Sequence, residues 1–218
     1  MDKLRKTDVS SLFLLVILGL VLYVALDVVA QLLPPYYSPV SQAESDLAVG
    51  KFGFVMTINF LNRGLFSLLF ILAFLRTLNL AKVARSHFRT GVYLLGVWAV
   101  GALLLAGFPT DVPATPISWH GAIHLVVATI AFFGGALGAL IISLRLGKNE
   151  AFQKLRTSAL LIAIVSVILL FVALATLTGP LGGLTERLFL GSVLLWIGVT
   201  SAYLATHIKG KNNLLNAK

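Results

Sequence analysis

Long apolar runs dominate the chain and alternate with short polar segments. Each run holds about 20 residues with few charges, which is the length an α-helix needs to cross a hydrocarbon core about 30 Å thick. We therefore predict an all-α membrane protein with six transmembrane helices in one domain, residues 1–218. The predicted helices cover residues 9–32, 54–76, 91–108, 119–144, 158–178 and 186–207.

The segments between the apolar runs contain the proline and glycine residues that commonly end helices. They include PPYYSP at 34–39, FPTD at 108–111 and TGPLGG at 178–183. The first apolar run, to about Leu33, is longer than the 7–15-residue core of a signal peptide, so we predict that it stays as a helix. No internal repeat is visible, and so nothing indicates an inverted-repeat transporter.

Composition agrees with a membrane protein and excludes several chemistries. Charged residues make up 11% of the chain and hydrophobic residues 58%, whereas soluble domains carry about 25% charged residues. The absence of cysteine excludes disulfides and thiolate catalysis. The net charge of +9 does not indicate a nucleic-acid partner, because the position of the charges matters more than their sum in a membrane protein.

The basic residues predict the orientation of the helices. Fourteen of the 17 lysines and arginines lie in the two termini and in the second and fourth connections, so the positive-inside rule places both termini in the cytoplasm. The acids lie mostly at the opposite, outer face. Acidic residues contribute little to topology, and their outward bias therefore needs another explanation.

Counting about 20 residues from each cytoplasmic helix end brings polar groups of four helices to one depth, near the outer boundary. We expect these groups to form an outward-facing polar pocket at the depth of the lipid headgroups. The residues predicted to bind a ligand there are Asp27, Asp46, Asn59, Asn62, Arg63 and Arg187.

Arg63 lies a few residues from the predicted bilayer centre, where an arginine costs about 2.5–3.5 kcal/mol and needs a partner or water. Asn59, Asn62 and Arg63 share one helix face, which Ser67 continues. This stripe either lines a cavity open to the outer side, or Arg63 extends outward to Asp27 or Glu186 and only locks the bundle.

His120 and His124 are four residues apart on a predicted helix, so both side chains could bind one ion. The residues proposed to act in catalysis are Asp111, His120, His124 and Glu186, and the metal ligands would be His120, His124 and Asp111, with a divalent ion such as zinc. The HxxxH pattern lacks the glutamate of the HExxH motif. The alternative is structural: one histidine bonds to the loop and the other packs against a carboxylate.

Other features favour packing over chemistry. No lysine lies within a predicted helix, which excludes a retinal-type Schiff base. Gly134 and Gly138 have the small-xxx-small spacing of helix contacts. Several aromatic residues lie mostly near predicted helix ends, where a membrane-interface belt is expected; they are Trp98, Trp119, Trp196, Tyr36 and Tyr37.

Four segments resemble the bacterial and archaeal membrane family called domain of unknown function 998. They are YSPVSQAESDL at 37–47, LLLAGFPTD at 103–111, HGAIH at 120–124 and GGLTERLFLGSVLLW at 182–196. The resemblance implies a helical bundle in the cytoplasmic membrane of a prokaryote, with no established activity. A looser similarity of arrangement links the chain to membrane hydrolases of the ceramidase and progestin-receptor-like superfamily, which have seven spans and more zinc-binding histidines.

Two classes of function remain open from the sequence. The first is metal-assisted hydrolysis of a lipid or lipid-linked substrate, in which arginines neutralise an anionic headgroup. The second is non-catalytic: binding or transport of a lipid or small solute, or an accessory role in the membrane. Both predict membrane lipids and a lipid-like or small-molecule ligand as partners.

Overall fold

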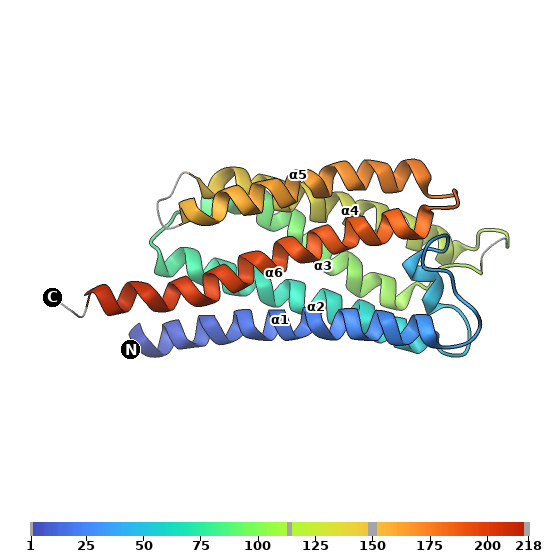
Figure 1. Ribbon diagram of the computed structural model, residues 1–218, viewed down its shortest axis with the longest axis horizontal. Coiled ribbons are helices and arrows are strands. Elements are labelled where there is room, and N and C mark those ends of the chain that lie inside the picture. Colours follow the sequence, from blue (N-terminus) through green and yellow to red (C-terminus); the bar gives the residue numbers. More distant parts are fainter. Residues whose placement is uncertain (1, 113–114, 148–151, 216–218) are drawn as a thin grey trace.

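The computed structural model describes residues 2–112, 115–147 and 152–215, and these residues form long helices joined by short connections (Figure 1). Helix α1 ends just before Pro34, because the residue before a proline disfavours the helical conformation. The side chain of Ser118 caps α4 by accepting a hydrogen bond from the Gly121 amide at 3.2 Å. The elements are α1 Asp2–Leu32, η1 Glu44–Ala48, α2 Gly53–Leu80, η2 Arg85–Phe88, α3 Arg89–Gly107, α4 Trp119–Leu146, α5 Gln153–Thr176 and α6 Gly182–Leu215.

Six helices of the described chain are long and apolar enough to cross a membrane, which confirms the predicted all-α bundle. Several helices extend past the predicted apolar runs; α2 continues to Leu80 and α5 starts at Gln153. The extensions have a simple cause, because helical hydrogen bonding continues into polar residues at the membrane surface and hydropathy detects only the apolar part. The cytoplasmic position of the termini stays a prediction.

Each helix packs against its neighbours in the chain, and α1 also packs against α6, so the six helices form a closed ring. Helix α1 begins and α6 ends at the same end of the bundle (Figure 1). We call the opposite end the distal end. It carries the connections 33–52, 108–118 and 177–181, and the first of these folds back over the bundle with η1 next to α1, α2 and α6.

Helices α3 and α4 approach closely because glycine lies at their contact. A Cβ atom on Gly134 would be 2.7 Å from the carbonyl oxygen of Leu94, and one on Gly138 would be 3.1 Å from that of Gly91. These obstacles are backbone atoms, so only a shift of a whole helix could relieve them. The structure thus confirms the predicted packing role of the two glycines.

We expect Gly134→Ala to lower the stability of the protein by about 1–3 kcal/mol, because the added methyl group forces α3 and α4 apart. Gly191→Ala is the matched control, since a Cβ there meets no atom within 4 Å and alanine favours the helix. Thermal unfolding in detergent micelles measures both. Equal melting temperatures for the two variants would contradict the close contact.

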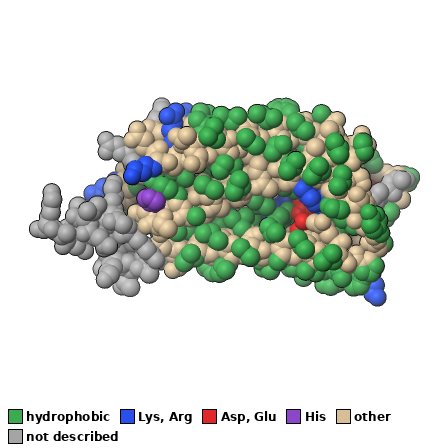
Figure 2. Space-filling model, viewed as in Figure 1, with side chains coloured by type: hydrophobic (Ala, Val, Ile, Leu, Met, Phe, Trp, Pro, Cys, Tyr) green, Lys and Arg blue, Asp and Glu red, His purple; other side chains and the backbone are tan. Residues whose placement is uncertain are grey.

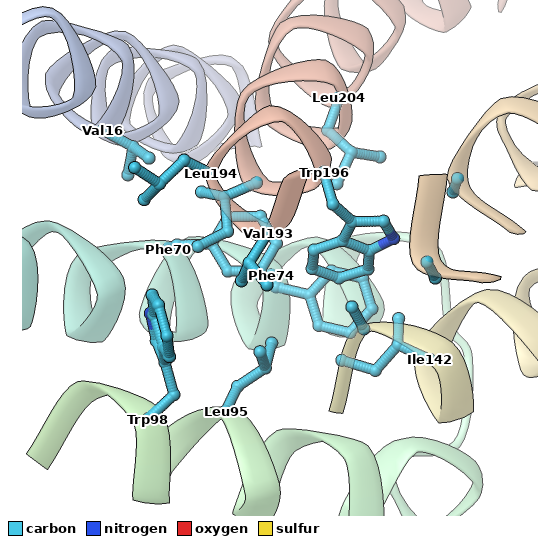
Figure 3. Close-up of a cluster of buried hydrophobic side chains, with 14 of the residues drawn as sticks. Val16, Phe70, Phe74, Leu95, Trp98, Ile142, Val193, Leu194, Trp196 and Leu204 are labelled. Carbon is cyan, nitrogen blue, oxygen red and sulfur yellow. The ribbon is translucent and has the colours of Figure 1, made fainter. Parts of the chain in front are cut away.

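An apolar core fills the middle of the ring and extends toward the end that carries the termini (Figure 3). Trp98 and Trp196 both have 0% exposure in this core, and their indole nitrogens donate hydrogen bonds to Ser67 Oγ at 3.2 Å and Ser143 Oγ at 2.8 Å. The expectation that these two tryptophans belong to an interface belt is therefore wrong. They lie inside because serine hydroxyls accept the indole hydrogen bonds, and a buried indole N–H usually finds such a partner.

Candidate functional site

Charged and amide side chains from separate parts of the chain meet inside the distal half of the bundle. We call this group the distal cluster. It comprises Tyr23 and Asp27 of α1, Glu44 of η1, Asn59 and Arg63 of α2, and Glu186 and Arg187 of α6.

Arg187 fixes the connection 33–52 over the cluster. Its Nη1 donates to the carbonyl oxygens of Pro39, Gln42 and Gly183 at 3.3, 3.1 and 3.3 Å. Its Nη2 donates to the hydroxyl of Tyr37, which in turn donates to backbone carbonyls of the same connection. Burial raises the pKa of Tyr37, so this hydroxyl keeps its proton. Arg187 is thus a clamp between α6 and the connection.

Glu44 enters the bundle interior because the connection is held in this way. Its side chain is 3% exposed; the Tyr23 hydroxyl donates to Oε1, and the Glu44 backbone amide donates to Glu186 Oε2 at 3.1 Å. Burial, with a contribution from the charge of Asp27, raises the pKa of Glu44 to about 7, although the Arg63 charge and the Tyr23 hydrogen bond act in the opposite direction. Glu44 can therefore hold a proton near neutral pH.

The raised pKa of Glu44 predicts a pH dependence of stability. Because its folded pKa of about 7 exceeds the ordinary value of 4.5, the folded state holds the proton more tightly, and stability falls as pH rises from about 4.5 to 7. The groups that face Glu44 are Tyr23, Asp27, Arg63 and Glu186. Melting temperatures of the wild type and Glu44→Gln across this range test the effect. The variant should show the flatter profile, and parallel profiles would contradict this role of Glu44.

Arg63 is 1% exposed and lies between aromatic rings. Its guanidinium carbon is 5.3 Å from the centre of the Phe60 ring and 4.8 Å from that of Trp98. The Arg63 charge interacts electrostatically with Glu44 and Glu186. Yet its Nε and Nη2 atoms have no hydrogen-bond partner among the residues that the structure describes. Buried donors without a hydrogen-bond acceptor are uncommon in proteins, because most buried polar groups have a hydrogen-bond partner.

Apolar side chains separate the distal cluster from both ends of the bundle. The central core lies on the side of the termini, and a second apolar group lies toward the distal surface. That second group includes Tyr37, Leu47, Met56 and Phe60, from the connection 33–52 and from α2. A ligand from the distal side must therefore pass the connection or enter between helices.

One edge of the cluster reaches the side of the bundle. Asp27 Oδ1 and Arg187 Nη2 are 3.8 Å apart, and the two side chains are 16% and 17% exposed, between α1 and α6. In the distal half of the face that carries α1 and α6, Figure 2 shows acidic and basic groups next to each other among hydrophobic side chains. In a membrane, charges on this side of the bundle would be costly unless they were paired or solvated, and Asp27 and Arg187 form such a pair.

Three predicted site residues form a separate group at the start of α4. Asp111 accepts hydrogen bonds from Ser118 N at 2.9 Å and Ser118 Oγ at 2.6 Å, and these bonds lower the pKa of its carboxyl. His120 Nδ1 lies 3.2 Å from Pro109 O and 3.7 Å from Asp111 Oδ1. His124 Nδ1 lies 2.7 Å from Phe108 O. The contacts of this group hold residues 108–111 next to the start of α4.

The predicted site residues thus divide between two places. Asp27, Asn59, Arg63, Glu186 and Arg187 meet in the distal cluster, whereas Asp111, His120 and His124 stay with their own loop. In the described part of the chain, no group of three or more histidine, aspartate and glutamate side chains could hold a metal ion. Glu186 is bonded to the Glu44 amide and therefore belongs to a different group from the histidines.

Two further predicted residues lie beside the cluster. Asn62 faces α1 and donates to the Gly19 carbonyl oxygen at 2.9 Å. Asp46 is partly buried on η1, and burial raises the pKa of its carboxyl. The sequence analysis missed Tyr23 and Tyr37. Tyr23 could have been found, because it is four residues before Asp27 and shares its helix face. Tyr37 lies in a connection without periodicity, so no pattern indicated its role.

The fold and the cluster define a multi-pass membrane helical bundle with a polar interior group near one end. A family model described as a protein of unknown function, DUF998, matches residues 17–203. The chain belongs to that family. Comparisons with curated proteins and with solved structures found no match.

Proposed function

We propose that the protein binds a ligand with an anionic oxygen group, a phosphate or carboxylate, at Arg63 in the distal cluster, without catalysing a reaction. The observation that carries this proposal is the buried guanidinium with two donor nitrogens, Nε and Nη2, that no described residue satisfies. These two nitrogens match the paired oxygens of a phosphate or carboxylate. The Phe60 and Trp98 rings hold the guanidinium in place.

The position of the cluster favours a membrane ligand. The Asp27–Arg187 pair lies at the side of the bundle between α1 and α6, so a lipid headgroup has a polar point of entry there. A free anionic solute from the distal side would need the connection 33–52 to move. The Arg63 guanidinium would bind the anionic group of a lipid headgroup or of a free solute in the same way.

Binding to the purified protein in detergent micelles tests the proposal. A phospholipid should bind more tightly than diacylglycerol with the same acyl chains, because only the phospholipid carries a phosphate. Arg63→Lys keeps the charge but loses the planar donor pair, and we expect it to weaken phospholipid binding about tenfold. Inorganic phosphate, tested in parallel, identifies a free solute as the ligand.

Arg85→Lys is the matched control, because it makes the same substitution at an exposed arginine outside the distal cluster. It should leave binding unchanged. The proposal fails if Arg63→Lys binds phospholipid and phosphate as the wild type does, or if diacylglycerol binds as tightly as phospholipid.

Metal-assisted hydrolysis is the second candidate function, and one observation favours it. The Nδ1 atoms of His120 and His124 both face backbone carbonyl oxygens, which leaves each Nε2 available to an ion. The ion would be held by His120 and His124, with water or substrate as its further ligands and without Asp111 or Glu186. Under this function the purified protein carries about one zinc ion per chain, and the His120→Ala, His124→Ala double variant loses it. A metal-free wild type would exclude this function.

A further inference from the structure

Two buried acceptor atoms in the distal cluster have no hydrogen-bond donor among the described residues. They add to the two donor atoms of Arg63 that have no acceptor. Asn59 is 0% exposed; its amide nitrogen donates to the Tyr23 carbonyl oxygen at 3.1 Å, but its Oδ1 has no partner among the described residues. Asp27 Oδ1 also has no hydrogen-bond partner among the described residues, although Arg187 Nη2 lies 3.8 Å from it and Gln31 donates to the other oxygen of that carboxylate. The cluster therefore presents both donors and acceptors to a ligand.

The donors and the acceptors belong to residues about one helical turn apart. Asn59 is one helical turn from Arg63 on the same face of α2, about 6 Å closer to the distal end. The hydrogen bond from Asn59 to Tyr23 joins α2 to α1 at this level, and Asp27 is one turn further toward the distal end on α1. The cluster thus offers two poles to a ligand, the Arg63 guanidinium and the acceptor oxygens of Asn59 and Asp27.

The charges of the cluster favour a ligand that carries both signs. Three carboxyl groups, those of Asp27, Glu44 and Glu186, face the two guanidinium groups of Arg63 and Arg187. A purely anionic ligand would place a further anionic group beside these buried carboxyl groups, which is costly unless a cation accompanies it. A ligand with an ammonium group beside its anionic group leaves the net charge unchanged.

We infer that the ligand of the distal cluster is zwitterionic, with its anionic group at Arg63 and an N–H-bearing ammonium group at Asn59 and Asp27. This inference rests on the proposed function and specifies its ligand. An ethanolamine phosphate carries both groups, a phosphate for Arg63 and an ammonium with N–H donors for Asn59 and Asp27. A free solute with the same two groups has the same chemistry.

Three phospholipids with identical acyl chains test this inference on the full-length protein in detergent micelles. Phosphatidylethanolamine carries a phosphate and N–H donors, phosphatidylcholine carries a phosphate and a methylated cation without N–H donors, and phosphatidylglycerol carries a phosphate without a cation. Native mass spectrometry measures the bound fraction of each lipid. We expect phosphatidylethanolamine to bind about tenfold more tightly than the other two lipids. Soluble glycerophosphoethanolamine, tested in parallel, shows whether the headgroup alone suffices.

Variants test whether the acceptor oxygens of Asp27 and Asn59 cause the preference for phosphatidylethanolamine. Asp27→Asn should reduce the ratio of phosphatidylethanolamine binding to phosphatidylglycerol binding to near unity. Asp46→Asn is the control, because it makes the same substitution at a partly buried aspartate that is not one of the proposed ligand contacts. This variant should keep the wild-type preference for phosphatidylethanolamine. Asn59→Leu removes the second acceptor and gives the same test if Asp27→Asn does not fold. The comparison of lipids on the wild type needs no variant.

The outcomes separate the two proposals. Equal binding of the three phospholipids that depends on Arg63 overturns the zwitterion inference and leaves the proposed function standing. Equal binding of phosphatidylethanolamine and phosphatidylcholine, both tighter than phosphatidylglycerol, also overturns the need for N–H donors. If no phospholipid, inorganic phosphate or glycerophosphoethanolamine binds, both proposals fail.

Discussion

Replacing Arg63 with methionine is expected to lower the free energy of unfolding by about 3–5 kcal/mol. The side chain is 1% exposed, and its charge acts on the buried carboxyl groups of Glu44 and Glu186. Methionine fills most of the space of the arginine side chain but leaves the two carboxyl groups without their cation. Removing one ion of a buried ion pair costs far more stability than replacing both ions with apolar side chains. Thermal unfolding in detergent micelles measures the loss.

The same reasoning predicts a partial rescue. Adding Glu44→Gln to Arg63→Met removes one of the buried carboxyl groups that the Arg63 charge compensates and should recover part of the lost stability, so the two substitutions are not additive. Arg85→Met is the control at an exposed arginine and should change stability by no more than about 0.5 kcal/mol. Additive effects of Arg63→Met and Glu44→Gln would show that the two side chains do not depend on each other.

Replacing Arg187 with leucine is expected to release the connection 33–52 from α6. The guanidinium donates to three backbone carbonyl oxygens and to the Tyr37 hydroxyl, and hydrogen bonds from a charged donor each contribute about 1.5–3 kcal/mol. Since such contributions are not additive, we expect a total loss of about 3 kcal/mol. Hydrogen exchange should become faster across residues 37–48 before it changes in the core helices.

Two substitutions calibrate the result for Arg187. Arg187→Lys keeps the charge but cannot reach three carbonyls and a hydroxyl at once, and it should fall between the wild type and Arg187→Leu. Lys51→Leu removes an exposed charge from the same connection and should leave the exchange rates of residues 37–48 unchanged. If Arg187→Leu keeps the wild-type exchange rates, the connection is held by other contacts.

The helices could be predicted from the sequence because a membrane imposes length and apolarity on every segment that crosses it. The same constraint placed Asp27, Asn59 and Glu186 near one depth, and these three residues do belong to one cluster. Hydropathy is less informative about helix ends, as the longer α2 and α5 show.

The composition of the site could be predicted only in part. Counting residues along a helix gives the depth of a side chain but not its direction around the bundle. His120 and Asp111 were therefore grouped with Glu186, although they bond to their own loop and Glu186 faces Glu44. The inward position of Glu44 depends on the folding back of the connection 33–52, which no periodic pattern indicates.

The most direct test of ligand binding at Arg63 is an experimental structure of the protein in a bilayer that contains phosphatidylethanolamine. We predict non-protein density within hydrogen-bonding distance of Arg63 Nε and Nη2, extending toward Asn59 and Asp27. Direct hydrogen bonds from both Arg63 nitrogens to Glu44 or Glu186, with no further density beside them, would contradict a ligand site and make Arg63 a structural residue.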